Sequence, residues 1–444
     1  MSILLKKFKE KVRNTDDVES INLTYFQSTM IIYGLKSLVD MKKTIQLIKK
    51  YIFMDTLPNP PESLEKSIFS LGTVYTNEMY KIINELLDGK VLIFLNNMEL
   101  VVCIDPIEIQ LNKAVEASIN ENVIQGSQIA FNESLLVNIG TMRKFYHSNQ
   151  LKVKKFSFGN TRKRDTSLLY LEEITPEGLL DNVCRQIERN LKNDLKNLQD
   201  VIRYLGLNPR NIIPLINTTE LPQEAISALE KGRIILFIES MPFALILPNL
   251  LSDMFITNND QNFPIPMLIA IRLLRIIGIL ISLLVPGLYV ALVAVNPEVF
   301  RIELALTIAQ SREGVPYPAF IEMIIMLVIM EMIIEACIRM PSNIGTTITM
   351  VGGIILGQSV VEAKLVSNMM IIILAATTIA SSTVNGFQNS ASIRIFKFGI
   401  VILASIFGIL GILVGFLIIC IYLSSIEVFG IPFTHSVGKV KEEE

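Results

Sequence analysis

Three glutamates interrupt an otherwise apolar stretch of the chain, Ala319–Ile338, and they are the first residues whose chemistry needs an explanation. They are Glu322, Glu331 and Glu335. A charge in the middle of a bilayer costs about 2.5–3.5 kcal/mol, so carboxylates in such a stretch should face protein or water. Glu331 and Glu335 are four residues apart and share a helix face, whereas Glu322 points elsewhere. Both are candidates for lining a pore or a cavity, and the alternative is an ion pair with a basic residue such as Arg339.

A stripe of small and hydroxylated residues marks the next apolar run, Ile344–Val361. Its members are Thr346, Thr349, Gly353 and Gly357. Small residues let transmembrane helices approach closely, so packing is the default role, but the hydroxyl groups make this stripe a candidate for lining the same pore or cavity. A later stripe has no hydroxyl groups, and helix packing is its expected role. It consists of Ala404, Gly408, Gly411 and Gly415.

Residues typical of catalysis or metal binding are scattered. His147 and His435 have no partners at the spacing of a metal site or a catalytic triad. The four cysteines have neither disulfide-framework nor zinc-ligand spacing. We find no glycine-rich phosphate loop or nucleophile elbow, and therefore expect no enzyme activity, metal or cofactor. The basic cluster Arg162–Arg164 lacks interleaved aromatic residues, so we expect a solvated turn and no nucleic-acid binding.

Five apolar runs in the second half of the chain must position the candidate residues. They are Ile276–Val295, Ala319–Ile338, Ile344–Val361, Leu365–Val384 and Gly399–Leu423. A helix of about 20 residues spans roughly 30 Å, the thickness of the hydrocarbon core of a bilayer. Residues 266–431 are therefore predicted to form a membrane domain of about five transmembrane helices.

Basic residues predict the orientation of these spans. Arg272 and Arg275 precede the first run, which marks that end as cytoplasmic. Five spans that alternate from there place each basic loop on the cytosolic side. The amphipathic piece Phe300–Gln310 can instead be re-entrant or lie in the membrane interface, so the number of spans and the side of the C-terminus stay open.

Residues 1–265 hold most of the charge and are predicted to form a cytosolic α/β domain. The basic, amphipathic start MSILLKKFKEKVRN lacks the apolar core of a signal peptide. Two segments match each other: a helix ends near Gly89 or Gly232, a basic residue follows, and two β-rich runs come next. We therefore predict two related subdomains with hairpins at residues 89–104 and 232–247. Residues 432–444 form a polar tail.

Several longer motifs run through both halves of the chain. They are Gly126–Arg143 (G-S-x-x-x-F-x-E-S-L-x-x-N-I-x-x-x-R), Arg275 with Leu284–Tyr289 (LVPGLY), Arg312–Glu322 (REGVPYPAFIE), Glu335–Pro341 (EA, then RMP), Val351–Gln358 (VGGIILGQ) and Phe429–Phe433 (FGIPF). Together they resemble the A subunit of spore germinant receptors, the GerA type, over residues 126–433. The chain departs from that pattern at Gln125, at Asn385-Gly386 and at Tyr422, where a basic residue, a proline and a histidine are usual. These departures bear on subfamily and ligand response rather than on membership.

The resemblance implies a non-enzymatic membrane subunit of a nutrient germinant receptor, located in the inner membrane of dormant spores. In that family the A subunit works beside a transporter-like B subunit, which senses small nutrients, and a lipoprotein C subunit. It is thought to assemble as a pentameric ring whose membrane helices form a cation-release channel. These properties follow from the resemblance and not from composition or spacing.

Two other functions stay open from the sequence. A sporulation-type paralogue would amplify ion release without a nutrient sensor of its own. A membrane scaffold would anchor partner proteins and conduct nothing. Neighbouring genes for B and C subunits distinguish a receptor from the paralogue, and conductance in liposomes distinguishes a channel from a scaffold.

Overall fold

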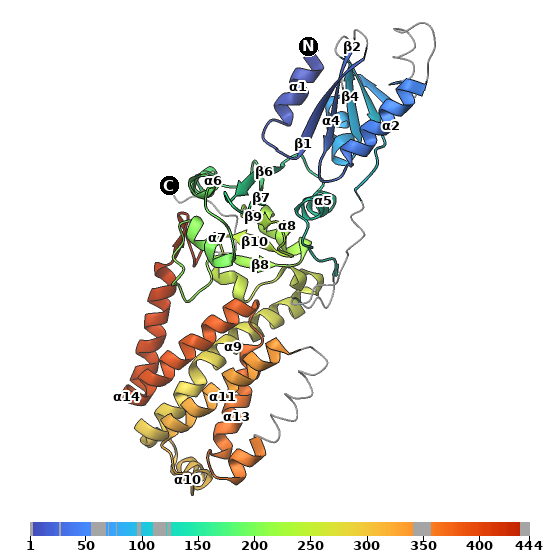
Figure 1. Cartoon of the computed structure of the whole chain (residues 1–444). Coiled ribbons are helices and arrows are strands. Elements are labelled where there is room, and N and C mark those ends of the chain that lie inside the picture. The colour runs from blue at the N-terminus through green and yellow to red at the C-terminus, as the bar shows by residue number, and fades with distance from the viewer. Residues whose placement is uncertain are drawn as a thin grey trace.

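Two five-stranded antiparallel sheets form the first half of the protein, and helices form the second half (Figure 1). The computed structural model describes residues 3–25, 28–54, 68–69, 71–76, 78–95, 99–109, 121, 126–340 and 357–435. The two sheets lie one after the other along the molecule, and the second sheet is adjacent to the helices. This arrangement confirms an α/β region followed by a helical region.

The first sheet has the strand order β1-β2-β4-β5-β3. Its strands are β1 (Val18–Tyr25), β2 (Ser28–Leu35), β3 (Thr73–Thr76), β4 (Val91–Leu95) and β5 (Leu100–Ile104), with helices α1 (Ile3–Lys11), α2 (Met41–Met54) and α4 (Met79–Leu87). Every residue of β4 is buried, as expected for a central strand rich in aliphatic side chains. Phe8 of α1 packs against Tyr33 and Phe94 with ring centroids 5.0 Å away from it in each case, which fixes α1 on the sheet.

The second sheet has the strand order β6-β7-β9-β10-β8. Its strands are β6 (Leu151–Phe158), β7 (Arg164–Leu171), β8 (Asn217–Thr219), β9 (Ile234–Ile238) and β10 (Ala244–Leu247), with helices α5 (Leu135–Phe145), α6 (Glu177–Asn190), α7 (Leu198–Tyr204) and α8 (Pro222–Glu230). Alternate side chains of β9 enter two separate cores, one with α6 and α7 and the other with α5 and α8. Both faces of this sheet are therefore covered by helices.

The two sheets share one connection pattern. In each, a hairpin is followed by helical structure, an edge strand, a helix and a second hairpin that inserts between the first hairpin and the edge strand. Gly89 and Gly232 both adopt positive φ, and each precedes a basic residue that pairs with a carboxylate. Lys90 lies 2.7 Å from Glu85, and Arg233 lies 2.6 Å from Asp253. That both sheets descend from one repeated unit stays a prediction.

The helical region begins at the end of the second sheet. Short 3₁₀ turns at Leu251–Met254 and Asn258–Asn262 come first. The helices that follow include α9 (Ile265–Val290), α10 (Ile302–Ser311), α11 (Ala319–Arg339), α13 (Asn368–Ser381) and α14 (Phe387–Ser425). A π turn, Ala291–Val295, extends α9. Two segments, Ile265–Val295 and Phe387–Ser425, have the length and apolar composition to cross a bilayer, so the five predicted spans are not confirmed.

The helix α14 is a hairpin. Gly408 interrupts it with φ +61° and ψ −137°, a conformation that glycine adopts readily and other residues do not. The rings of Phe396 and Tyr422 lie 5.8 Å apart, whereas a straight helix would separate these residues by roughly 39 Å. We call residues 387–407 the outgoing arm and residues 409–425 the returning arm. The prediction of a single span over Gly399–Leu423 is therefore wrong.

Close packing of the two arms explains the second stripe of small residues. A Cβ atom on Gly411 would lie 2.1 Å from the carbonyl oxygen of Leu403 on the outgoing arm. Ala404 is fully buried in the same contact region. The predicted packing role thus holds for Ala404, Gly411 and Gly415, although their partner is the other arm of the same hairpin, whereas Gly408 forms the break between the arms.

The chain returns to the α/β region after α14 (Figure 1). Strands β11 (Glu427–Val428) and β12 (Ile431–Pro432) pair with each other. Ile431 is buried in the core that the second sheet forms with α6 and α7, and Phe433 is buried with Leu215 and Met254. The N–H of Leu251 donates to the carbonyl oxygen of Phe433 at 2.9 Å. Both ends of the helical region thus lie beside the second sheet, and five alternating spans are not confirmed.

Candidate functional site: charged residues of the helical region

Helix α11 carries the three glutamates, and the structure places them in three different environments. Glu322, in the first turn, is completely buried. One of its carboxylate oxygens accepts a hydrogen bond from the N–H of Ser367 at 2.6 Å. The other lies 3.3 Å from a guanidinium nitrogen of Arg312. Because both partners come from outside α11, this carboxylate fixes one end of the helix to its neighbours.

The Glu322 carboxylate belongs to a larger polar cluster at the end of the bundle away from the sheets. Ser367 is the N-cap of α13, where its hydroxyl accepts from the N–H of Met370 at 3.3 Å. The hydroxyls of Ser367 and Tyr289 lie 3.0 Å apart. The sequence interpretation left Glu322 without a partner. The signal that was available is its motif, since Arg312 and Glu322 are the two ends of REGVPYPAFIE.

Glu331 points from α11 toward the outgoing arm of α14. Its carboxylate lies 3.0 Å from Arg394 and 3.9 Å from Lys397. The basic side chains are only 12% and 3% exposed, so this is a largely buried ion cluster with one more positive than negative charge. Glu331 therefore faces the protein interior, but it is engaged in an ion pair.

The Glu335 side chain lies on the outer surface of the helical region and does not point between the helices. Its carboxylate accepts from Nε of Arg339 at 2.7 Å, one helical turn further on. The side chains of Glu335 and Arg339 are 55% and 78% exposed. This is the ion pair that the sequence offered as the alternative to a pore lining.

The stripe of the third apolar run is only partly within the described residues. Thr346, Thr349 and Gly353 lie outside them. Gly357 is described, and a Cβ atom placed on it would meet nothing within 4 Å. The role of this stripe stays a prediction.

The junction between the second sheet and α9 holds a further buried ion pair. Asp260 accepts from Arg275 through both carboxylate oxygens, at 2.6 and 2.8 Å. Burial of Asp260 raises its pKa, but the hydrogen bonds from Arg275 and Thr257 outweigh that effect and hold the pKa below its usual value. Arg275 also donates to the carbonyl oxygen of Phe255 at 3.1 Å. The basic head of the first span thus anchors this helix to the α/β region.

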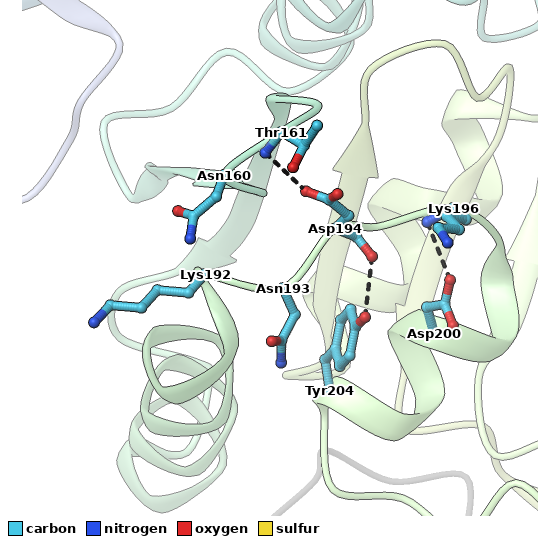
Figure 2. Close-up of a pocket in the computed structure, with 8 residues that line it drawn as sticks. All are labelled: Asn160, Thr161, Lys192, Asn193, Asp194, Lys196, Asp200 and Tyr204. Carbon is cyan, nitrogen blue, oxygen red and sulfur yellow. Dashed lines mark hydrogen bonds between the residues drawn. The ribbon is translucent and has the colours of Figure 1, made fainter.

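A polar surface pocket of about 410 Å³ lies between the β6–β7 turn and the α6–α7 connection. Figure 2 shows its two carboxylates turned toward the backbone. Asp194 accepts from the N–H of Thr161 at 3.2 Å, and Asp200 accepts from the N–H of Lys196 at 3.1 Å. The Lys192 side chain extends outward. The carboxylates therefore hold the loops together, and the basic cluster next to them is an exposed turn.

No group of three or more histidine, cysteine, aspartate or glutamate side chains with metal-binding geometry occurs among the residues that the structure describes. His147 lies 3.0 Å from Asp88, which joins the first subdomain to the second. The chemistry that the described side chains do support is ion pairing within a helical region.

The chain thus combines an α/β region with a helical region in which two segments have the length and apolar composition to cross a bilayer. Comparison with known proteins makes the assignment specific. The chain belongs to the Bacillus/Clostridium GerA spore germination protein family, whose model matches residues 6–444. This membership confirms the family resemblance and gives the protein a role in spore germination.

Individual relatives agree with the family. The chain is 30% identical to spore germination protein GerLA of Bacillus cereus, over 80% of this chain and 72% of that protein. It is 28% identical to spore germination protein A1 of Bacillus subtilis (strain 168), over 98% and 89% of the two chains. It is also 29% identical to the membrane protein YfkQ of the same organism, over 88% and 76%. None of these names describes an enzyme.

Among solved structures, the chain is similar to the N-terminal domain of the A subunit of the Bacillus megaterium spore germinant receptor GerK3. The match has a TM-score of 0.40 and 22% sequence identity, and it covers 56% of this chain and 94% of that one.

Proposed function

We propose that the protein is a non-enzymatic membrane subunit of a nutrient germinant receptor and that it forms an oligomeric, ligand-gated cation channel. Family membership supports the receptor role. The exposed Glu335–Arg339 pair on α11 is the observation that supports the conduit. Lipid does not accommodate an ionised surface, so this face of α11 should meet water or another subunit.

Glu335 is the better candidate for the conduit of the two predicted glutamates. Glu331 is matched by two largely buried cations, which leaves it little capacity to attract a passing ion. The pair of Glu335 is exposed, and exposed pairs contribute only about 0–1 kcal/mol, so its carboxylate can exchange partners readily. In the proposed assembly, copies of Glu335 from several subunits form an acidic ring that favours cations.

The proposed assembly is a homo-oligomeric ring, a pentamer by family resemblance, in the inner membrane of the spore. In it the α/β region lies on the cytosolic side. A transporter-like B subunit and a lipoprotein C subunit complete the receptor. Because B subunits sense nutrients in this picture, the chain described here supplies the ion pathway.

Cation flux through the full-length protein in liposomes tests the proposal. Glu335→Gln removes charge at nearly constant volume, so we expect the preference for cations over anions to fall while the pore size is kept. Thr349→Leu, in the predicted stripe, adds apolar bulk and should lower conductance for every ion. Glu303→Gln is the control, since Glu303 is an exposed residue of α10 at the other end of α11.

Two results would contradict this function. A correctly assembled protein that conducts nothing under any condition, with or without its partner subunits, is a scaffold. Unchanged conductance and selectivity in both Glu335→Gln and Thr349→Leu would remove these positions from the conduit.

A further inference from the structure

One residue of the second subdomain contacts both arms of the α14 hairpin. The N–H of Ile212 donates to the hydroxyl oxygen of Tyr422 on the returning arm at 3.0 Å. The carbonyl oxygen of Ile212 accepts from the hydroxyl of Ser392 on the outgoing arm at 2.7 Å. Both backbone polar groups of Ile212 are thus used to hold the arms, and we call these three residues the Ile212 clamp.

The segment that carries Ile212 is fixed to the second sheet. Asn249, two residues after β10, is fully buried, and its amide nitrogen Nδ2 donates to the carbonyl oxygen of Pro214 at 2.6 Å. Its backbone N–H donates to the carbonyl oxygen of Leu215 at 3.0 Å. A displacement of β10 therefore moves this segment with it, because buried hydrogen bonds are costly to break.

The side chains next to Ile212 extend the same connection. Ile213 is 1% exposed and packs in one core with Ile393 of the outgoing arm and Ile426 at the end of the returning arm. Asn249 also reaches Asn389 of the outgoing arm, with 3.4 Å between the two side chains. The second subdomain thus contacts both arms at their ends nearest the α/β region.

The opposite end of the hairpin is built differently. There the arms meet at Gly408, and the side chain of Asn296 accepts from the N–H of Ile409 at 3.1 Å. Glycine has the widest choice of backbone angles, so this apex can act as a pivot. A hairpin with a glycine pivot at one end and a clamp at the other converts a small movement of the clamp into a change of the angle between its arms.

We propose that the Ile212 clamp transmits movements of the second subdomain to the α14 hairpin, with the hydroxyls of Ser392 and Tyr422 as the positioning groups that set the separation of the arms. The effect of the clamp on ion flow rests on the proposed channel function. Its effect on the separation of the two arms does not depend on that function.

Distance measurements between spin labels on the two arms test the clamp in the full-length protein in lipid nanodiscs. Cys420 is exposed on the returning arm, and Ile395→Cys adds an exposed site on the outgoing arm. Cys337→Ala removes the other accessible thiol, since Cys103 and Cys184 are buried. Dilution with unlabelled chain leaves only distances within one subunit.

Into this labelled protein we would introduce Tyr422→Phe, Ser392→Ala and both together. Tyr422→Phe keeps the ring that packs on Phe396 and removes only the hydroxyl. Ser424→Ala is the matched control, because the hydroxyl of Ser424 donates within its own helix, to the carbonyl oxygen of Ile421. We expect the double variant to widen the distance distribution at least twofold, and the control to leave it unchanged. A double variant with the same distribution as the control would overturn the clamp.

Flux measurements on the same proteins separate this proposal from the channel itself. If the labelled protein conducts, the double variant should change the open fraction at least threefold while the single-channel conductance stays the same. An unchanged open fraction despite wider arms would overturn transmission by the clamp. If no protein conducts, the channel function fails, and the distances alone decide whether the clamp holds the arms.

Discussion

The three glutamates of α11 show how the surroundings of a residue change what its charge does. Glu322 is buried with one arginine and a backbone N–H, Glu331 is shared between an arginine and a lysine, and Glu335 is exposed with Arg339. A buried ion pair contributes little net stability, but removal of one partner strands the other charge in a medium that solvates it poorly. The cost of a substitution should therefore follow burial.

Glu322→Gln is the sharpest test of this rule. The substitution leaves Arg312 without its counter-ion and weakens the hydrogen bond from Ser367, so we expect a loss of about 3–5 kcal/mol in the free energy of unfolding. Unfolding of the purified protein in mixed micelles, followed by circular dichroism, measures it. Glu313→Gln is the control, since Glu313 is exposed and adjacent to Arg312. Equal stability of the two variants would mean that the Glu322 pair is not a structural tie.

The partners of these residues were harder to predict than the residues themselves. A carboxylate in an apolar run is conspicuous in any sequence, because its insertion cost is high. Its partner can come from any neighbouring helix, and Arg394 lies 63 positions beyond Glu331. Only Arg339, one turn along the same helix, was within reach of a prediction from local spacing.

At the scale of elements, the α14 hairpin is where local sequence signals were least informative. The run Gly399–Leu423 has the length and apolarity of a single span, and four small residues within it favour packing. Nothing in the run distinguishes Gly408 from Gly411 or Gly415. The break is decided by tertiary contacts, since the Asn296 side chain holds the N–H of Ile409 at the start of the returning arm.

A pair of glycine substitutions in α14 tests this account of the break. Gly408→Ala forces a side chain into a left-handed conformation and places its Cβ 1.9 Å from Oδ1 of Asn296. We expect it to lower the free energy of unfolding by at least about 1–3 kcal/mol. Gly399→Ala is the control, because its Cβ would meet nothing within 4 Å and alanine favours helix by up to about 1 kcal/mol. Unfolding in mixed micelles, followed by circular dichroism, measures the free energy of unfolding of both variants. An unchanged value for Gly408→Ala would argue against the pivot.

The sheets were easier to anticipate than the hairpin of helices. Val91–Leu95 and Ile234–Ile238 are continuous apolar runs that begin two residues after a glycine, which is typical of buried strands. The order of strands within each sheet could not be predicted, since β3 and β8 precede the central hairpins in sequence but lie at the edges. Strand order depends on which apolar faces the helices cover, and no local pattern records it.

At the scale of the whole molecule, the chain leaves the α/β region at α9 and returns to it at β11. The ion pair of Asp260 with Arg275 holds the departure, and the buried side chain of Phe433 holds the return. The two soluble parts pack on each other, so no bilayer can separate them. We therefore predict that the helical region crosses the membrane an even number of times.

This topology predicts that the two ends of the chain are accessible from the same side. Short tags placed before Ile3 and after His435 should both be protected from protease in intact cells, and both should be cleaved in inverted vesicles. A tag inserted at Glu313, in the loop between α10 and α11, should show the opposite pattern. Protection of one terminal tag without the other would contradict an even number of crossings.

The return of the chain to the α/β region also sets the order in which the protein can be completed. Ile431 fills a core whose other buried side chains all precede α9, and Val428 and Phe433 pack partly on such residues, among them Leu215 and Met254. A ribosome makes the residues that line these cores long before it reaches the residues that fill them, because the whole helical region is synthesised in between. A chain that stops within the helical region therefore keeps an incomplete apolar core in its α/β region, which chaperones and proteases recognise. The last strands, β11 and β12, can therefore complete these cores only after the helical region has been made.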